Sequence, residues 1–129
     1  LIGDDTGYGV YVESGYVTLH LTNPIVASHT WGITNTVPAS STVTTDHTLF
    51  WANGQDGIMG TNPVYVDPSF IDLGFGGFHL GLASAAVDVG GATVEDADLD
   101  GDTRPLGSAP DIGADEGRWV FVPLVLRGD

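Results

Sequence analysis

The sequence contains no cysteine and no lysine, and only 16% of its 129 residues are charged. Without cysteine the chain forms no disulfide and carries out no thiolate chemistry, so cysteine usage does not indicate a redox compartment. The three arginines are outnumbered by 17 acidic residues, which gives a net charge of −14. Because like charges repel and no basic stripe exists, this balance argues against nucleic acid and anionic membranes as partners.

Long hydrophobic runs are also missing. The longest apolar run, 119–126, is far shorter than the roughly 20 residues that a membrane-spanning helix needs, and no signal peptide is recognisable at the start. The first residue is Leu1 instead of methionine. We therefore expect a soluble chain, processed or excised from a longer precursor.

The residues that are plentiful predict an all-β fold. Glycine and proline number 19 and 7, and hydrophobic residues make up 42% of the chain. This composition indicates one domain of many short strands joined by turns, with enough apolar residues for a continuous core.

The first half of the chain repeats with a period of about 24 residues. Gly9, Gly32 and Gly57 recur at spacings of 23 and 25 residues, and 22–29 aligns with 46–53 at a spacing of 24. Internal periods of this size indicate stacked units that bury columns of apolar side chains. The alignment superimposes Leu19 on Val43, Ile25 on Leu49, and Ala27 on Trp51, which we expect to point inward.

Short strands follow from the alternation of apolar residues and from the turn residues between them. They are predicted at 9–12, 16–21, 24–27, 32–34, 42–45 and 48–51, with a projecting loop at 34–41. A last rung is expected from 78–80 and 85–89. The segment 119–126 contains Pro123 and is interpreted as an edge strand, where proline is tolerated.

The segment 96–116 concentrates six aspartates and one glutamate with a single arginine. Its opening, Asp-x-Asp-x-Asp-Gly, is the opening of a calcium-binding loop, in which alternating carboxylates converge on one cation. The twelfth position is Gly107 where an EF-hand requires glutamate, so the segment is not an EF-hand. Asp115 or Glu116 could also complete the shell, and the competing interpretation is a solvated acidic turn held by Arg104. The predicted calcium ligands are Asp96, Asp98, Asp100, Asp102 and Asp111.

The same segment carries a family resemblance. Residues 98–116, preceded by Phe78-His-Leu80 and by 84–90, resemble the C-terminal end of secreted bacterial right-handed parallel β-helix proteins, the pectate-lyase-like group often labelled as choice-of-anchor domains. The resemblance implies a right-handed parallel β-helix of about three to four rungs with an irregular C-terminal cap. Residues 1–95 would form the rungs, and 96–129 the acidic cap and C-terminal strand of the same domain.

Catalysis is not favoured by the positions of the charged residues. The resemblance implies that a lyase on this fold would use calcium with a lysine or arginine as the base, yet the three arginines all lie in the expected cap or tail. No pair of rung carboxylates shares a column, as glycoside hydrolysis would require. The four histidines have no metal-ligand spacing and are interpreted as surface or rung-edge residues: His20, His29, His47 and His79.

We therefore expect a non-catalytic, secreted or cell-surface protein with a structural or adhesive role, which assembles with itself end to end into filaments. The alternative is a fragment of a polysaccharide-active enzyme, either a lyase or a glycoside hydrolase, or a carbohydrate-binding module. Aromatic residues could form a sugar-stacking platform for extracellular polysaccharide or could simply fill the core. They are Tyr8, Tyr11, Tyr16, Trp31 and Trp51.

Overall fold

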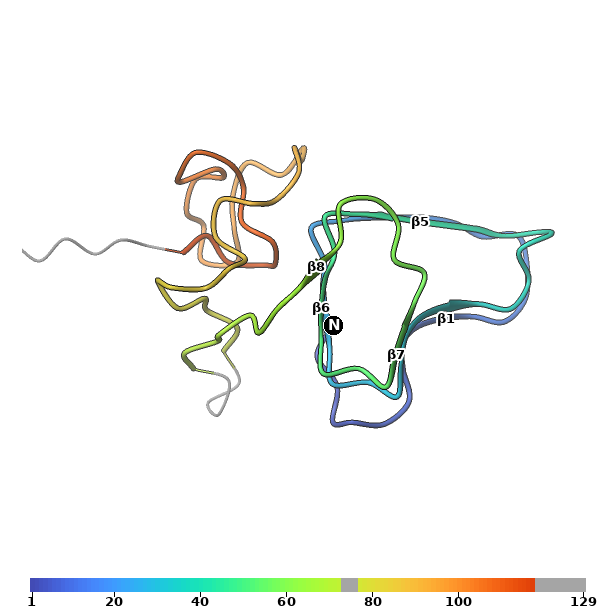
Figure 1. The fold of residues 1–129 in the computed structure, drawn as a ribbon. Helices are drawn as coiled ribbons and strands as arrows, with labels where there is room; N and C mark the ends of the chain where they lie inside the picture. Colours follow the sequence, from blue (N-terminus) through green and yellow to red (C-terminus); the bar gives the residue numbers. More distant parts are fainter. Residues whose placement is uncertain (73–76, 118–129) are drawn as a thin grey trace, which may run out of the picture.

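The computed structural model describes residues 1–72 and 77–117, and within these ranges the protein is all-β with no helix (Figure 1). Within the described ranges there is no helix with the length and apolarity needed to cross a membrane. The strands are β1 (Tyr8–Val12), β2 (Thr18–Thr22), β3 (Ile25–Ala27), β4 (Trp31–Asn35), β5 (Thr42–Asp46), β6 (Leu49–Trp51), β7 (Gln55–Gly57) and β8 (Val64–Tyr65).

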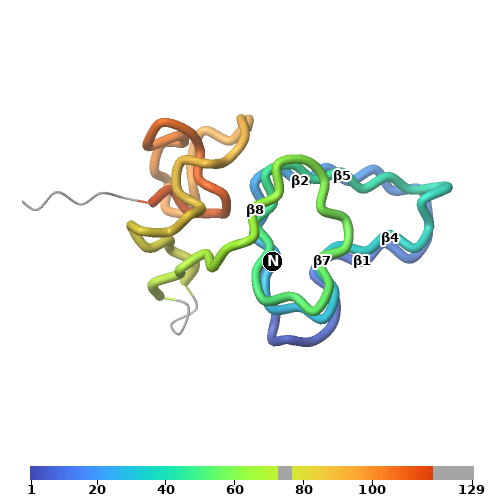
Figure 2. The backbone as a smooth tube through the Cα atoms, viewed as in Figure 1, coloured from blue at the N-terminus to red at the C-terminus, as the bar shows by residue number. Residues whose placement is uncertain are grey.

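The strands pair in parallel in three sheets, ordered β1–β4–β7, β2–β5 and β3–β6–β8. Strands that follow each other in the chain therefore belong to different sheets, and successive turns of the chain lie over one another (Figure 2). The register confirms the predicted alignment of 22–29 with 46–53, but Gly57 pairs with Ile33 and not, as the spacing of 25 had predicted, with Gly32. The paired residues include Tyr8 with Trp31, Leu19 with Val43, and Ile25 with Leu49.

Single residues with positive φ make the corners between sheets. Asn23 and His47, with φ of 56° and 49°, come just before β3 and β6, and Ser28 and Ala52, with φ of 58° and 53°, come just after them. This conformation costs a residue other than glycine about 1–2 kcal/mol, so the paired strands on either side must hold it. Both kinds of corner recur after 24 residues, which keeps the two turns in register.

Two hydrophobic clusters lie on opposite faces of the β3–β6–β8 sheet. Val26 and Phe50 belong to the cluster inside the turns, together with Ile33. Their neighbours Ile25 and Leu49 belong to a second cluster, which the C-terminal part of the chain completes. Burial on both faces explains why β3 reads as an unbroken apolar run. The members of the second cluster from the C-terminal part are Leu80, Ala86 and Ile112.

Several side chains differ from their predicted environments. Ile25, Ala27 and Leu49 were expected inside the stack but belong to the second cluster, on the outer face of the β3–β6–β8 sheet. Trp51 was expected inside the stack but is 43% exposed, because Leu49 and Phe50 already fill the two buried faces of this three-residue strand. His29 was expected at the surface but is buried, where its Nε2 lies 3.3 Å from the Leu1 carbonyl oxygen. The 24-residue repeat predicts which residues are neighbours on successive turns. It does not predict which face of each sheet is buried by the rest of the chain.

The predicted last rung, 78–80 with 85–89, does not form strands. Leu80 makes only an isolated antiparallel bridge to Phe70, and its amide donates to the Asp115 carboxylate at 2.7 Å instead of to a neighbouring turn. The described residues after 77 pack on the outer face of the β3–β6–β8 sheet. The division at residue 95 stays a prediction, and the expected strand 119–126 lies outside the described residues.

Replacing Leu49 with alanine should destabilise the protein by about 2–5 kcal/mol, because a fully buried leucine between the sheet and the C-terminal part leaves a cavity. Urea unfolding followed by circular dichroism measures the change. Val94→Ala, at a side chain that is 97% exposed, is the control and should alter stability by less than about 0.5 kcal/mol. Similar small losses for both variants would contradict the two-faced packing.

Candidate functional site

The acidic residues of the C-terminal part accept hydrogen bonds from backbone amides. Oδ1 of Asp98 accepts from the amides of Asp100 and Asp102 at 2.9 and 2.8 Å, and its Oδ2 accepts from Glu116 at 2.9 Å. Burial opposes ionisation, yet these bonds and the nearby Arg104 hold the pKa of Asp98 below its usual value. Asp98 is therefore ionised, and its carboxylate fixes the loop by accepting hydrogen bonds from these three amides.

Asp111 has the same role deeper in the structure. Its two oxygens accept from the amides of Asp88 and Gly117 at 2.7 and 2.6 Å. Burial raises the pKa of Asp111 despite these bonds. Because the loops have few strand partners, such carboxylates satisfy amides that would otherwise be buried without an acceptor.

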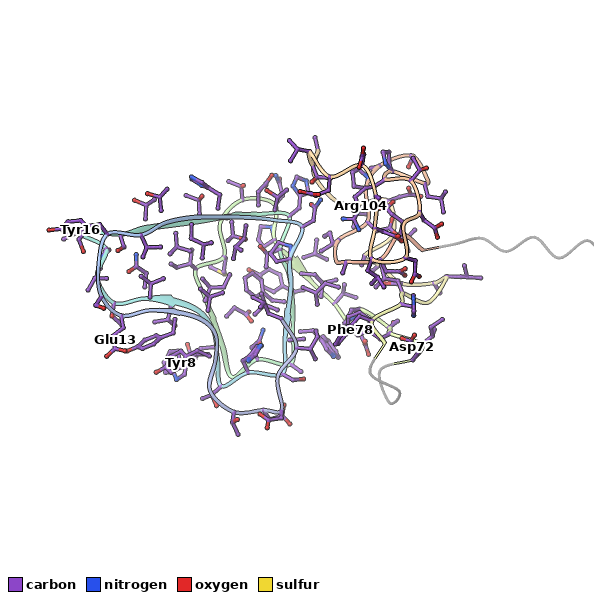
Figure 3. All side chains as sticks on the ribbon, turned by 180° about the vertical axis from the view of Figure 1, so that it is seen from behind. Tyr8, Glu13, Tyr16, Asp72, Phe78 and Arg104 are labelled. Carbon is purple, nitrogen blue, oxygen red and sulfur yellow. The ribbon has the colours of Figure 1, made fainter. Side chains whose placement is uncertain are left out.

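A buried ion pair lies in this part of the chain. Arg104 Nε is 3.0 Å from Glu116 Oε1, and the two side chains are 7% and 1% exposed. The Nε–H is not aligned for a hydrogen bond, so the contact is an attraction between charges. Glu116 also accepts from the amides of Asp111 and Leu106 at 2.9 and 3.0 Å, and Arg104 Nη1 donates to the Gly113 carbonyl. Arg104, which lies among the loops of the C-terminal part (Figure 3), thus holds the acidic segment, but in a buried ion pair and not in the solvated turn of the competing sequence interpretation.

The five aspartates predicted as calcium ligands are not all gathered at one point. Asp98 and Asp111 are engaged with backbone amides, Asp102 donates its amide to Asp98, and Asp96 is exposed and accepts the Arg104 amide at its carbonyl. Asp100 alone of the five joins a group of three side chains whose ligand atoms lie within 4.8 Å of one another. The group is His79, Asp100 and Asp115. Calcium binding by the five aspartates stays a prediction.

His79 lies between two carboxylates in this group. Its Nδ1 contacts Asp72, and its Nε2 is 2.8 Å from Asp100 Oδ2. The hydrogen bonds to Asp72 and Asp100 raise the pKa of His79 to about 9, and the bond from His79 lowers the pKa of Asp72. Burial raises the pKa of Asp115, the third member. The sequence offered Asp115 only as a further calcium ligand and His79 as a surface residue, because the two are 36 residues apart and follow no ligand spacing.

Aromatic side chains form a second exposed cluster, on the β1–β4 pair. The rings of Tyr8 and Tyr11 stack with centroids 4.3 Å apart, and Tyr8 stacks with its register partner Trp31 at 6.4 Å. The three side chains are 41–45% exposed. Among the described residues no ring contact joins Tyr16 or Trp51 to this cluster, and Tyr16 projects far from Tyr8 (Figure 3).

Comparisons of the chain with protein-family models, with curated proteins and with solved structures found no match. The family resemblance seen in the sequence stays an expectation.

Replacing Glu116 with glutamine should destabilise the protein by about 3–5 kcal/mol, because Arg104 would remain buried without a counter-charge. Guanidinium unfolding monitored by fluorescence measures the loss. The matched control is Glu95→Gln, at an exposed glutamate that should tolerate the change within about 0.5 kcal/mol. Equal stabilities for the two variants would show that the pair does not hold the segment together.

Proposed function

We propose that the chain is a right-handed parallel β-helix that acts as a non-catalytic, secreted or cell-surface scaffold and adheres to neutral extracellular polysaccharide through its aromatic face. Three parallel sheets with a 24-residue register support the β-helix. The right-handedness and the extracellular setting rest on the family resemblance of the C-terminal segment.

The observation that carries the adhesive role is the exposed ring cluster of Tyr8, Tyr11 and Trp31. Each ring is more than 40% exposed, and the neighbouring ring planes are 17–26° apart. Strand pairing holds the backbone under these rings in a fixed register. Tyrosine and tryptophan have few rotatable bonds, so such a platform loses little entropy when a ligand lies across it.

The chemistry of the platform favours a sugar. One face of a pyranose ring presents C–H groups, which are apolar and are attracted to the negative face of an aromatic ring. The hydroxyl groups at the sugar's edge need polar partners, and Gln55 follows Trp31 in the same register column. The net charge of −14 repels acidic glycans, which selects a neutral polysaccharide.

The described arginine supports a binding role over the alternative of a lyase. Arg104 is buried against Glu116, so it is not positioned to take a proton from a polysaccharide. Arg104 therefore stabilises the C-terminal loops and does not act as a catalytic base.

Affinity electrophoresis through gels that contain a neutral β-glucan should retard the protein, whereas polygalacturonate gels should not. Trp31→Ala and Tyr8→Ala should each weaken the affinity for the glucan about fivefold, since an aromatic contact contributes roughly 1 kcal/mol beyond its buried area. Trp51→Ala is the matched control, because Trp51 is equally exposed but belongs to another sheet.

Two results would contradict the proposal. The first is that Trp51→Ala weakens retardation as much as Trp31→Ala does, and the second is that no neutral gel retards the protein. Either result would show that the aromatic cluster is not a polysaccharide-binding surface. Release of soluble oligosaccharides from either polysaccharide would favour the enzyme fragment instead.

A further inference from the structure

A cavity of about 550 Å³ lies beside the loops of the C-terminal part, and its lining includes Asp102, Glu116 and three potential metal ligands whose ligand atoms lie close together. These are the members of the group described above, His79, Asp100 and Asp115. Apolar side chains, among them Ile71 and Leu82, form other parts of its wall. A pocket with polar groups converging in an apolar wall is the usual form of a small-ligand site.

Asp115 is the most buried member of this group. It is 4% exposed, and its Oδ2 accepts the Leu80 amide at 2.7 Å. Its Oδ1 accepts no hydrogen bond from the residues that the structure describes, and it is not among the fully buried atoms, so it can be reached from the cavity. A buried carboxylate is costly unless it is paired or binds a metal, and Asp100, a second carboxylate, lies within 4.8 Å of it.

His79 is held as a metal-binding histidine is held. Asp72 contacts its Nδ1, and the same carboxylate accepts the His79 backbone amide at 3.0 Å. A carboxylate behind one ring nitrogen fixes the tautomer and aims the other nitrogen at the ion. The other nitrogen, Nε2, faces Asp100.

We propose that His79 Nε2, Asp100 and Asp115 form a binding site for one divalent transition-metal ion of the zinc class, with Asp72 as the residue that orients His79. One nitrogen and two carboxylate oxygens suit Zn²⁺, which commonly takes three protein ligands and keeps a fourth position for water. Ca²⁺ is disfavoured here, since it takes six to eight oxygen ligands.

His79 and Asp100 need to move little to admit the ion. Zinc ligands lie about 2.0–2.2 Å from the metal, so two of them in tetrahedral arrangement are roughly 3.4 Å apart. His79 Nε2 and Asp100 Oδ2 are 2.8 Å apart, close enough for a hydrogen bond. The proton between them would be replaced by the metal as the two groups separate by less than an ångström.

The test is calorimetric titration of the chelator-treated full chain with Zn²⁺ and, separately, with Ca²⁺. We expect one Zn²⁺ per chain and no competition by Ca²⁺. His79→Gln and Asp100→Asn should abolish binding, and Asp72→Asn should weaken it about 10- to 100-fold. Two matched controls should leave it unchanged: Asp96→Asn, in the same acidic segment, and His47→Gln, beside Asp46.

Asp115→Asn could unfold the loops, because its carboxylate accepts the Leu80 amide. Asp100 is the safer position, since its side chain is 46% exposed, and circular dichroism verifies that its variant keeps the native spectrum. A second readout is the visible spectrum of added Co²⁺, which should lose its protein-bound bands in His79→Gln but keep them in His47→Gln.

Three results would overturn the site. The first is that Zn²⁺ produces no heat of binding. The second is that Zn²⁺ still binds to both the His79→Gln and the Asp100→Asn variants. The third is that Ca²⁺ binds to the natural chain but not to Asp96→Asn. The last would place the ion in the acidic loop predicted from the sequence. None of these results depends on polysaccharide binding, so the two proposals fail separately.

Discussion

In-register parallel pairing between turns of about 24 residues is the constraint on which the rest of the structure depends. It aligns residues such as Leu19 with Val43 and Tyr8 with Trp31, so every outward or inward position is repeated on the next turn. The buried columns form the core. The outward-facing column on β1 and β4 brings the rings of Tyr8 and Trp31 together through the register alone. Corner residues with positive φ must recur at the same period, because a shift of one residue would move each side chain to the opposite face.

The C-terminal part of the chain satisfies its backbone by a different means. Beyond residue 77 the described residues contain no strand, and carboxylates accept many of the amides there. Asp98, Asp111 and Glu116 between them bind the amides of residues spread over loops that no sheet connects. Much of the acidity that appears in the sequence as a candidate cation loop is therefore structural. The exceptions are informative, because Asp100 and Asp115 lie at a cavity together with His79.

The sequence predicted the features that depend on period and local pattern. The repeat predicted the pairing of 22–29 with 46–53 in the correct register. It did not predict that Trp51 is exposed, because that depends on Leu49 and Phe50 filling both faces of β6. The grouping of His79 with Asp100 and Asp115 was missed for a related reason. Residues separated by 21 and 36 positions in irregular loops meet only through tertiary packing.

Cysteine pairing across the turns tests the register most directly, because the natural chain contains no cysteine. His20 and Thr44 are exposed register partners on β2 and β5, and neighbouring strands are about 4.8 Å apart, within the range that a disulfide spans. The double variant His20→Cys with Thr44→Cys should oxidise to an intramolecular disulfide. His20→Cys with Thr42→Cys, displaced by two residues, should stay reduced, since its Cα atoms would be roughly 8 Å apart. Bridging of the displaced pair in preference to the aligned pair would contradict the stacked 24-residue register.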